Sequence, residues 1–275
     1  MAAMRTSPDV TREVLRLRAG GTGLHAVRLR VARPSAAMAL VFLHEGLGSV
    51  AQWRDFPDAL CAELSLDGLA YDRAGHGASD AAPAPRTSRY LHDEAWQVLP
   101  ALLDAAGIAR AVLVGHSDGG TIALLFAARF PDRVAAAITE AAHVHVEPET
   151  LAGIAAAVAA WRTTDLRRRL ERHHGAKAEA LFCAWADTWL APGFRHWTIA
   201  AELAGLACPL LLIQGGDDEY GTAAQMDAIA RAARGPVERL LLPGVGHTPH
   251  RQDRARTLRA MVDFVRRRVA DLTGA

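Results

Sequence analysis

The chain has 275 residues, enough for one α/β core that buries roughly 75% of the surface its unfolded chain exposes. Its 31 basic and 30 acidic residues leave a formal net charge of +1, which excludes a broad field for collecting nucleic acid or anionic membrane. We therefore expect a single folded unit without a nucleic-acid or membrane partner.

The cysteines and the N-terminal segment indicate the cellular compartment of the protein. Cys61, Cys183 and Cys208 are odd in number and lack metal-ligand spacing, which argues against a disulfide framework or a structural zinc and favours the cytoplasm. Met1–Val10 lacks the apolar run of a signal peptide. No stretch of the sequence is as long as the run of about 18 apolar residues that a membrane span needs. We predict no metal and no cofactor, and the sequence carries no signal for an oligomeric state.

The first elements predict a hairpin that leads into a parallel sheet. Residues 14–31 alternate apolar and polar residues around Gly20-Gly21-Thr22-Gly23, as antiparallel hairpins do. Apolar runs of buried-strand length follow, most of them separated by helix-compatible stretches. They lie at Ala39–Leu43, Gly68–Tyr71, Ala111–Val114, Val134–Ile138, Leu210–Ile213 and Arg239–Leu242. This order predicts a doubly wound α/β architecture with a mostly parallel sheet of eight strands.

The regular alternation stops between Val144 and Leu203, where the sequence reads as helix after helix with no strand candidate. We expect an inserted helical cap after the sixth strand. Residues 1–143 and 204–275 would then form the core, and residues 144–203 the cap.

Residues 111–128 predict a strand, a tight turn and a helix. The turn is Gly115-His116-Ser117-Asp118-Gly119, a G-x-S-x-G pattern whose glycines allow close backbone approach around an exposed hydroxyl. It resembles the nucleophile elbow of the α/β-hydrolase superfamily, and Gly120 extends it to the G-H-S-x-G-G form common there. The resemblance implies that Ser117 is a nucleophile. The alternative is a tight glycine turn without a catalytic role.

A serine hydroxyl needs a base to remove its proton, and the superfamily places an acid and then a histidine downstream. The last predicted strand runs into Pro243-Gly244-Val245-Gly246-His247, which resembles the histidine loop of the superfamily. This position makes His247 the predicted base, with His250 as the nearest competitor.

The predicted acid follows the preceding strand, in Gly215-Gly216-Asp217-Asp218-Glu219. The superfamily's G-x-x-D form gives Asp218 when counted from Gly215, and Glu219 when counted from Gly216. We favour Asp218, with Asp217 next. The acid would fix the imidazole tautomer and stabilise the imidazolium.

Acyl transfer also needs N–H donors that point at the developing oxyanion. The N–H of Asp118, directly after Ser117, is the first expected donor. His44-Glu45-Gly46-Leu47-Gly48-Ser49 resembles the H-G-x-x-x-S element of the superfamily, with Glu45 in place of the usual glycine. Gly46 is therefore the second expected donor, and Glu45 and Leu47 are alternatives. Residues 72–79 resemble the D-x-R-G-x-G-x-S turn and support the fold.

Four residues are candidates for substrate binding. Trp185 and Trp189 are four residues apart on one helix face, either as a core stripe or as an aromatic roof over the pocket. His143 follows a strand at the sheet edge where α/β folds bind ligands, and Glu45 lies in the oxyanion loop. The cap side chains that could meet an anionic substrate are Arg162, Arg195 and His196.

These residues predict an esterase-like hydrolase that cleaves a small-molecule carboxylic ester or thioester through an acyl-Ser117 intermediate. One alternative is C–C hydrolysis of a ring-cleavage product, and another is ligand binding with slow turnover. Epoxide hydrolysis and dehalogenation are disfavoured, because related enzymes carry aspartate at the elbow. The H-E-G-L-G-S and G-H-S-D-G-G motifs resemble a subset of the superfamily whose members are named only as α/β hydrolases, so they specify no substrate.

Overall fold

The computed structural model describes residues 10–82 and 85–269 of the chain. Of the segment predicted to lack a signal peptide, Met1–Val10, only Val10 lies within these residues. None of the helices in these residues combines the length and hydropathy needed to cross a bilayer.

An eight-stranded sheet forms the centre of the molecule, in the order β1-β2-β4-β3-β5-β6-β7-β8. The strands are β1 (Val10–Ala19), β2 (Thr22–Val31), β3 (Ala39–Leu43), β4 (Asp67–Tyr71), β5 (Ala111–His116), β6 (Val134–Glu140), β7 (Leu210–Gly215) and β8 (Val237–Leu242). Strands β3 to β8 run parallel to one another, whereas β1 and β2 pair antiparallel and β2 joins β4 antiparallel. The predicted mostly parallel, doubly wound architecture is therefore confirmed.

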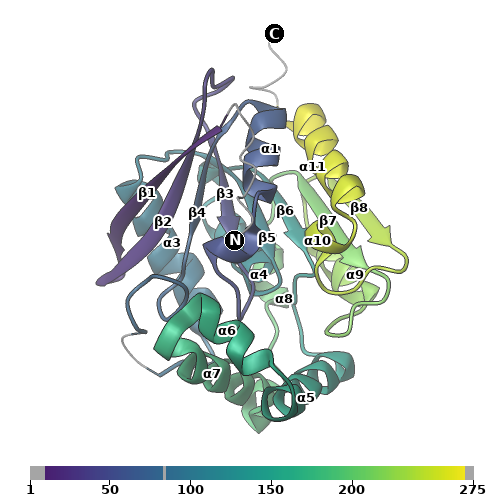
Figure 1. Ribbon diagram of the computed structural model, residues 1–275. Coiled ribbons are helices and arrows are strands. Elements are labelled where there is room, and N and C mark those ends of the chain that lie inside the picture. The colour runs from purple at the N-terminus through teal and green to yellow at the C-terminus, as the bar shows by residue number, and fades with distance from the viewer. Residues whose placement is uncertain (1–9, 83–84, 270–275) are drawn as a thin grey trace.

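Helices cover both faces of the sheet (Figure 1). The α-helices are α1 (Phe56–Leu64), α2 (Tyr90–Asp93), α3 (Leu99–Ala105), α4 (Asp118–Arg129), α5 (Pro148–Thr163), α6 (Leu166–His174), α7 (Ala178–Leu190), α8 (Ala200–Leu203), α9 (Ala223–Ala232), α10 (Pro249–Gln252) and α11 (Arg254–Arg268). Short 3₁₀ or π segments lie at Val50–Trp53, Glu94–Val98, Pro131–Arg133, Gly175–Lys177 and Pro192–Phe194. One apolar cluster packs α1 and α11 on one face, and a second packs α3, α4 and α9 on the other.

Coverage of both faces explains why the central strands are continuous apolar runs. All residues of β3, β5, β6 and β7 are buried, so no position along them needs a polar side chain facing water. The hairpin at the sheet edge differs, because outward positions of β1 such as Val14 are exposed. Gly20 and Gly21 turn the hairpin with φ of 57° and 77°, the left-handed region that two-residue hairpin turns require.

Helices α5, α6 and α7 form a separate layer across one end of the sheet (Figure 1), and we refer to residues 148–203 as the cap layer. Its α6 end is hydrogen-bonded to the core. His174 accepts from Gly77 N (2.9 Å) and donates to Leu47 O (3.0 Å), while Lys177 Nζ donates to the carbonyls of Gly77 and Ser79. These bonds hold the cap layer against the loops that follow β3 and β4.

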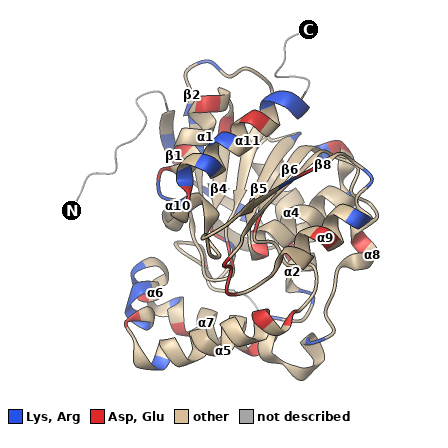
Figure 2. Cartoon of the chain, turned by 90° about the vertical axis from the view of Figure 1, so that its right-hand side faces the viewer, with Lys and Arg blue, Asp and Glu red and all other residues tan. Residues whose placement is uncertain are grey.

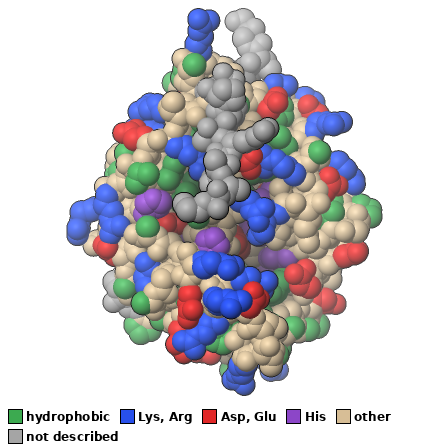
Figure 3. Space-filling model, viewed as in Figure 1, with side chains coloured by type: hydrophobic (Ala, Val, Ile, Leu, Met, Phe, Trp, Pro, Cys, Tyr) green, Lys and Arg blue, Asp and Glu red, His purple; other side chains and the backbone are tan. Residues whose placement is uncertain are grey.

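Charged residues lie mainly at the surface. Figure 2 shows basic positions on α6 and in the last turn of α11. Figure 3 shows Lys and Arg side chains standing out on one face among acidic and apolar ones. The side chains of Arg167, Arg168 and Arg169 are exposed, as are those of Arg266, Arg267 and Arg268.

The first turn of α4 lies directly against the ends of β3 and β5. A Cβ atom added at Gly119 would overlap the carbonyl group of Leu43, and one added at Gly115 would overlap the backbone of Gly119. Only glycine permits this approach, which sets the position of Ser117 between β5 and α4.

We expect Gly119→Ala to lower the free energy of unfolding by about 3 kcal/mol or more, because its methyl group meets backbone that cannot move aside cheaply. Urea denaturation followed by circular dichroism measures the change. Gly193→Ala is the matched control, since a Cβ there meets nothing within 4 Å. Equal stability of the two variants would contradict the close approach of α4 to β3.

Candidate active site

Ser117 occupies a strained backbone conformation between β5 and α4. Its φ of 53° and ψ of −117° lie in the left-handed half of conformational space, which costs a non-glycine residue about 1–3 kcal/mol. Two hydrogen bonds hold it there, from Ser117 N to Glu140 O (2.8 Å) and from Thr121 N to Ser117 O (3.0 Å). The strain fits the predicted elbow, which presents the hydroxyl at a sharp turn.

His247 and Asp218 form a tight pair. His247 Nδ1 lies 2.9 Å from both carboxylate oxygens of Asp218, whose side chain is fully buried. Gln214 Nε2 and Tyr220 N donate to the same carboxylate, at 2.6 and 2.8 Å. Burial opposes the charge, but the bond to His247 and the other donors outweigh it and lower the pKa of Asp218. The ionised acid keeps the proton of His247 on Nδ1 and leaves Nε2 free to accept one.

The alternative candidates for the acid and the base do not take part in the contact between Asp218 and the His247 ring. Asp217 is exposed, and its own N–H donates to Val245 O. Glu219 accepts the backbone N–H of His247 at 3.2 Å, and so supports the loop rather than the imidazole. His250 is buried against Glu140, with Nδ1 3.1 Å from the carboxylate. The structure therefore places Asp218, and not these neighbours, on the ring of His247.

A cavity of about 100 Å³ lies beside Ser117 and His247. Its lining comprises Glu45, Gly46, Leu47, Ser117, Asp118, His143, Thr150, Ile154, Trp185, Trp189, Tyr220 and His247. All the residues predicted for catalysis, for the oxyanion or as the four substrate-binding candidates border it, except Asp218. Within the described residues no hydrogen bond joins Ser117 Oγ to His247. Such bonds are often loose in unliganded sites and tighten when substrate binds.

The two expected oxyanion donors border this cavity with their N–H groups uncommitted. Neither Gly46 N nor Asp118 N has an acceptor among the described residues. Trp185 covers Gly46 so closely that a Cβ added there would lie 2.7 Å from its indole ring. Glycine at this position lets the cap layer reach the oxyanion loop.

The carboxylate of Asp118 is held by core and cap together. Arg73 Nη1 and Nη2 lie 3.2 Å from it, and Tyr90 OH donates to it at 3.0 Å. Tyr90 OH in turn accepts from Trp189 Nε1 at 2.9 Å. Sequence reasoning missed Arg73, which it treated as support for the fold. A buried acid needs a cationic partner, so the acid directly after Ser117 was the sequence feature that could have indicated a residue such as Arg73.

A second pair, also missed, joins the loop after β3 to the end of β5, which in turn contacts the loop of His247. His116 Nδ1 lies 3.4 Å from Glu45 Oε2, and His116 Nε2 donates to His247 O at 2.7 Å. Burial disfavours charge on this imidazole, but Glu45 and Glu140 outweigh burial and raise the pKa of His116 to about 9. His116 is therefore a cation at neutral pH.

The cap residues divide into two groups. Trp185 and Trp189 are buried and also border the cavity beside Ser117. Arg162, Arg195 and His196 are exposed and line no cavity beside Ser117, so the prediction that they meet an anionic substrate there is not supported.

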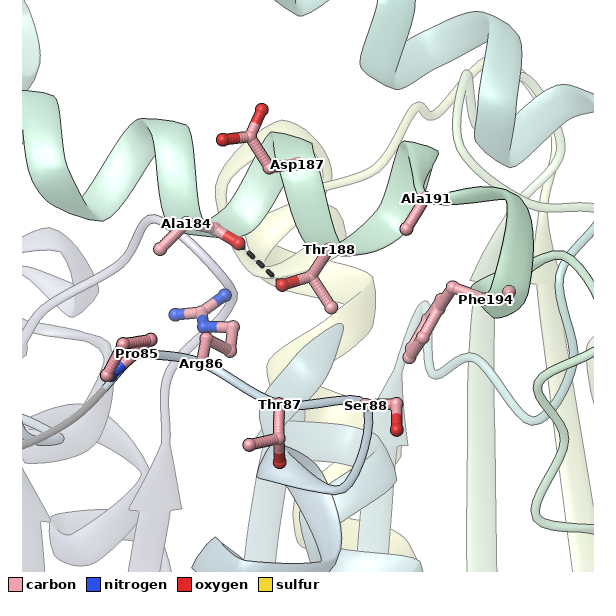
Figure 4. A pocket seen from close by; sticks show the side chains of 10 residues that line it. Pro85, Arg86, Thr87, Ser88, Ala184, Asp187, Thr188, Ala191 and Phe194 are labelled. Carbon is pink, nitrogen blue, oxygen red and sulfur yellow. Dashed lines mark hydrogen bonds between the residues drawn. The ribbon is translucent and has the colours of Figure 1, made fainter.

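A separate cavity of about 500 Å³ lies between residues 85–88 and α7 (Figure 4). Arg86 points from that segment toward α7 near Ala184, while Thr188 and Phe194 border it from the cap side. None of the predicted site residues lines it. Within the described residues no group of His, Cys, Asp and Glu side chains could hold a metal ion.

Known proteins resemble this chain in sequence and structure. A family model described as alpha/beta hydrolase fold matches residues 39–205. "Putative carbamate hydrolase RutD" of Pseudomonas savastanoi pv. phaseolicola (strain 1448A / Race 6) is 29% identical over 260 residues, 82% of this chain and 93% of that protein. The 2-hydroxymuconate semialdehyde hydrolase of Pseudomonas sp. (strain CF600) is 32% identical over 137 residues, 49% of this chain and 44% of that one.

The solved structure of 2-hydroxy-6-oxo-6-phenylhexa-2,4-dienoate hydrolase from Rhodococcus sp. strain RHA1 has the same fold. It aligns with a TM-score of 0.76 at 18% sequence identity, over 93% of this chain and 100% of that chain.

The His116–Glu45 pair predicts a pH-dependent stability. Because the folded pKa of about 9 exceeds the unfolded value of about 6.5, the pair stabilises fully below about pH 6.5, and this stabilisation is lost as pH rises through 9. We expect wild type to lose about 1–3 kcal/mol of unfolding free energy over this window relative to Glu45→Gln. Urea denaturation at a series of pH values measures it. Parallel stability curves for the two proteins would contradict the charged pair.

Proposed function

The chain belongs to the α/β-hydrolase fold family, whose model matches residues 39–205, and from this premise we propose that it is a serine hydrolase. It cleaves a small-molecule carboxylic ester or thioester through an acyl-Ser117 intermediate. The observation that carries the proposal is the shared cavity of Ser117 and His247, with Asp218 2.9 Å from the far side of the imidazole.

In the proposed reaction, Ser117 Oγ attacks the carbonyl carbon while His247 Nε2 takes its proton. The N–H groups of Asp118 and Gly46 bind the oxyanion, a contribution of about 10²–10³ in turnover for each donor. The bond to the leaving group breaks as His247 returns the proton to it. Water then attacks the acyl-serine by the same route and releases the acid.

Asp218 and the loop contacts act through His247. The buried carboxylate stabilises the imidazolium that forms in each step, while His116 and Glu219 hold the loop at the carbonyl and the N–H of His247. We propose residues 144–203 as the cap domain that closes the cavity, because Trp185 and Trp189 come from it.

C–C bond hydrolysis is the second candidate, because the 2-hydroxymuconate semialdehyde hydrolase is 32% identical over about half of this chain. A dienoate of the kind named for the Rhodococcus enzyme is an anion. Among the described residues that line the cavity beside Ser117 there is no Lys or Arg, so the cavity favours the uncharged ester. The similarity to a carbamate hydrolase adds carbamates to the acyl compounds worth assaying.

The other proposals concern binding and location. Slow turnover with retained ligand would identify a binding protein on the same fold, and single-turnover kinetics distinguishes it from an enzyme. We propose the cytoplasm as the location, because Cys61, Cys183 and Cys208 are all free thiols.

We expect Ser117→Ala to lose about 10⁴-fold or more in kcat/KM on aryl acetates, since no other group supplies the nucleophile. A fluorophosphonate probe should label wild type at Ser117 and leave the variant unlabelled. Ser88→Ala, at an exposed serine, should keep both activity and labelling. Turnover that survives in Ser117→Ala would contradict the acyl-serine mechanism.

We expect Asp218→Asn to lose about 10³- to 10⁴-fold in kcat with its fold intact, because the amide no longer stabilises the imidazolium. Asp217→Asn removes the neighbouring exposed carboxylate and should stay within about twofold of wild type. Steady-state kinetics on one aryl ester compares them. The reverse order of effects would identify Asp217 as the acid.

A further inference from the structure

Glu45 brings a carboxylate to the cavity beside Ser117. It is the chain neighbour of Gly46, borders the same cavity as Ser117, and its side chain is 26% exposed. Among the described residues no hydrogen-bond donor serves either of its carboxylate oxygens. Its backbone oxygen, by contrast, accepts from Gly48 N and Arg73 Nη2. The partly exposed side chain therefore has an acceptor, Oε1, available to whatever occupies the cavity.

This carboxylate is ionised. Burial alone would favour its neutral form, but the His116 imidazolium at 3.4 Å outweighs burial and holds the pKa of Glu45 well below its ordinary value. The 3.4 Å contact involves Oε2 alone, so it leaves Oε1 free to accept a hydrogen bond.

Several other polar side chains of the cavity are already engaged, although Tyr220 OH and Trp185 Nε1 have no hydrogen-bond partner among the described residues. Asp118 is bonded to Arg73 and Tyr90, and the Thr150 hydroxyl donates to Tyr220 O at 2.7 Å. His143 Nε2 donates to the same carbonyl at 3.0 Å, which leaves its Nδ1 as a buried acceptor without a donor. Apart from the groups proposed for catalysis and Asp118, the charged group of the lining is therefore Glu45, an acceptor, and the unpaired donors of the lining are neutral.

The cavity is small and carries no compensating cation. Its volume of about 100 Å³ is far below the roughly 300–1,000 Å³ of pockets for drug-sized ligands. Within its described lining there is no Lys or Arg, and Arg73 behind it is already paired with Asp118. A carboxylate on the acyl group would be repelled by Glu45 with no cation to compensate, whereas a hydroxyl or amino group would meet a charged acceptor.

We infer that Glu45 is a specificity-determining residue that selects esters of short acyl groups carrying a hydroxyl or amino group next to the scissile carbonyl. The inference rests on the proposed function, since it names the substrate class of the same site. A hydrogen bond to a charged group discriminates by about tenfold or more against an isostere that lacks the donor. Acyl groups ending in a carboxylate are rejected.

Matched aryl esters test this selection. Glycolyl, glycyl, propionyl and hemimalonyl esters of one phenol are compared by kcat/KM, each divided by its rate of hydrolysis without protein. Wild type should prefer glycolyl and glycyl over propionyl by about tenfold or more, with hemimalonyl last. Glu45→Gln should reduce the preference severalfold. Glu219→Gln removes a nearby carboxylate that does not line the cavity, and should keep the preference.

A binding measurement decides the inference independently of turnover and of the folding of Glu45→Gln. In Ser117→Ala, the intrinsic tryptophan fluorescence, to which Trp185 and Trp189 of the cavity contribute, is titrated with glycolamide, propionamide and malonamate. Glycolamide should bind about tenfold more tightly than propionamide, and malonamate most weakly. Absence of ester turnover together with this order would contradict the proposed function alone. Equal affinities, tight malonamate binding, or an ester preference that is the same in Glu45→Gln would overturn the inference.

Discussion

The close contact between the first turn of α4 and the backbone of β3 and β5 is the constraint on which the site depends. It exists because Gly115 and Gly119 have no side chains at the contact. It forces Ser117 into a φ of 53°, and hydrogen bonds from the ends of neighbouring elements hold that strain. The same contact brings the oxyanion loop after β3 to the N-terminus of α4, where free N–H groups and a partial positive charge meet. The proposed nucleophile and the expected donors are thus positioned by one packing contact.

Around this contact, buried charges hold the loops in place. Asp118 pairs with Arg73, Glu140 with His250, and Glu45 with His116. An unpaired buried charge costs several kcal/mol, so each pair restricts the loops that carry its members to arrangements in which the partners meet. Two of these pairs include a residue directly beside Ser117. The electrostatics of the site therefore depend on these supporting pairs as much as on Asp218 and His247.

The features that could be predicted from the sequence are those that a short segment determines by itself. The strand, turn and helix around Ser117 lie within one short segment, and the parallel strands are apolar runs because both sheet faces are covered. Asp218 and His247 could be placed because each follows a strand whose carboxyl end meets the same sheet edge. Tertiary pairing was not encoded locally. Arg73 lies 45 residues from Asp118, and His116 contacts the carbonyl of a residue 131 positions away. The roles of these residues follow only from the folded chain.

Trp185 rests on Gly46 with no space for a methyl group between them. The indole belongs to α7 and the glycine to the loop after β3, so two distant parts of the chain share one steric condition. In evolutionary terms, the two positions are expected to be coupled, because a side chain at position 46 requires the indole or its helix to move. Divergence of the cap for new substrates is therefore limited by the oxyanion loop beneath it.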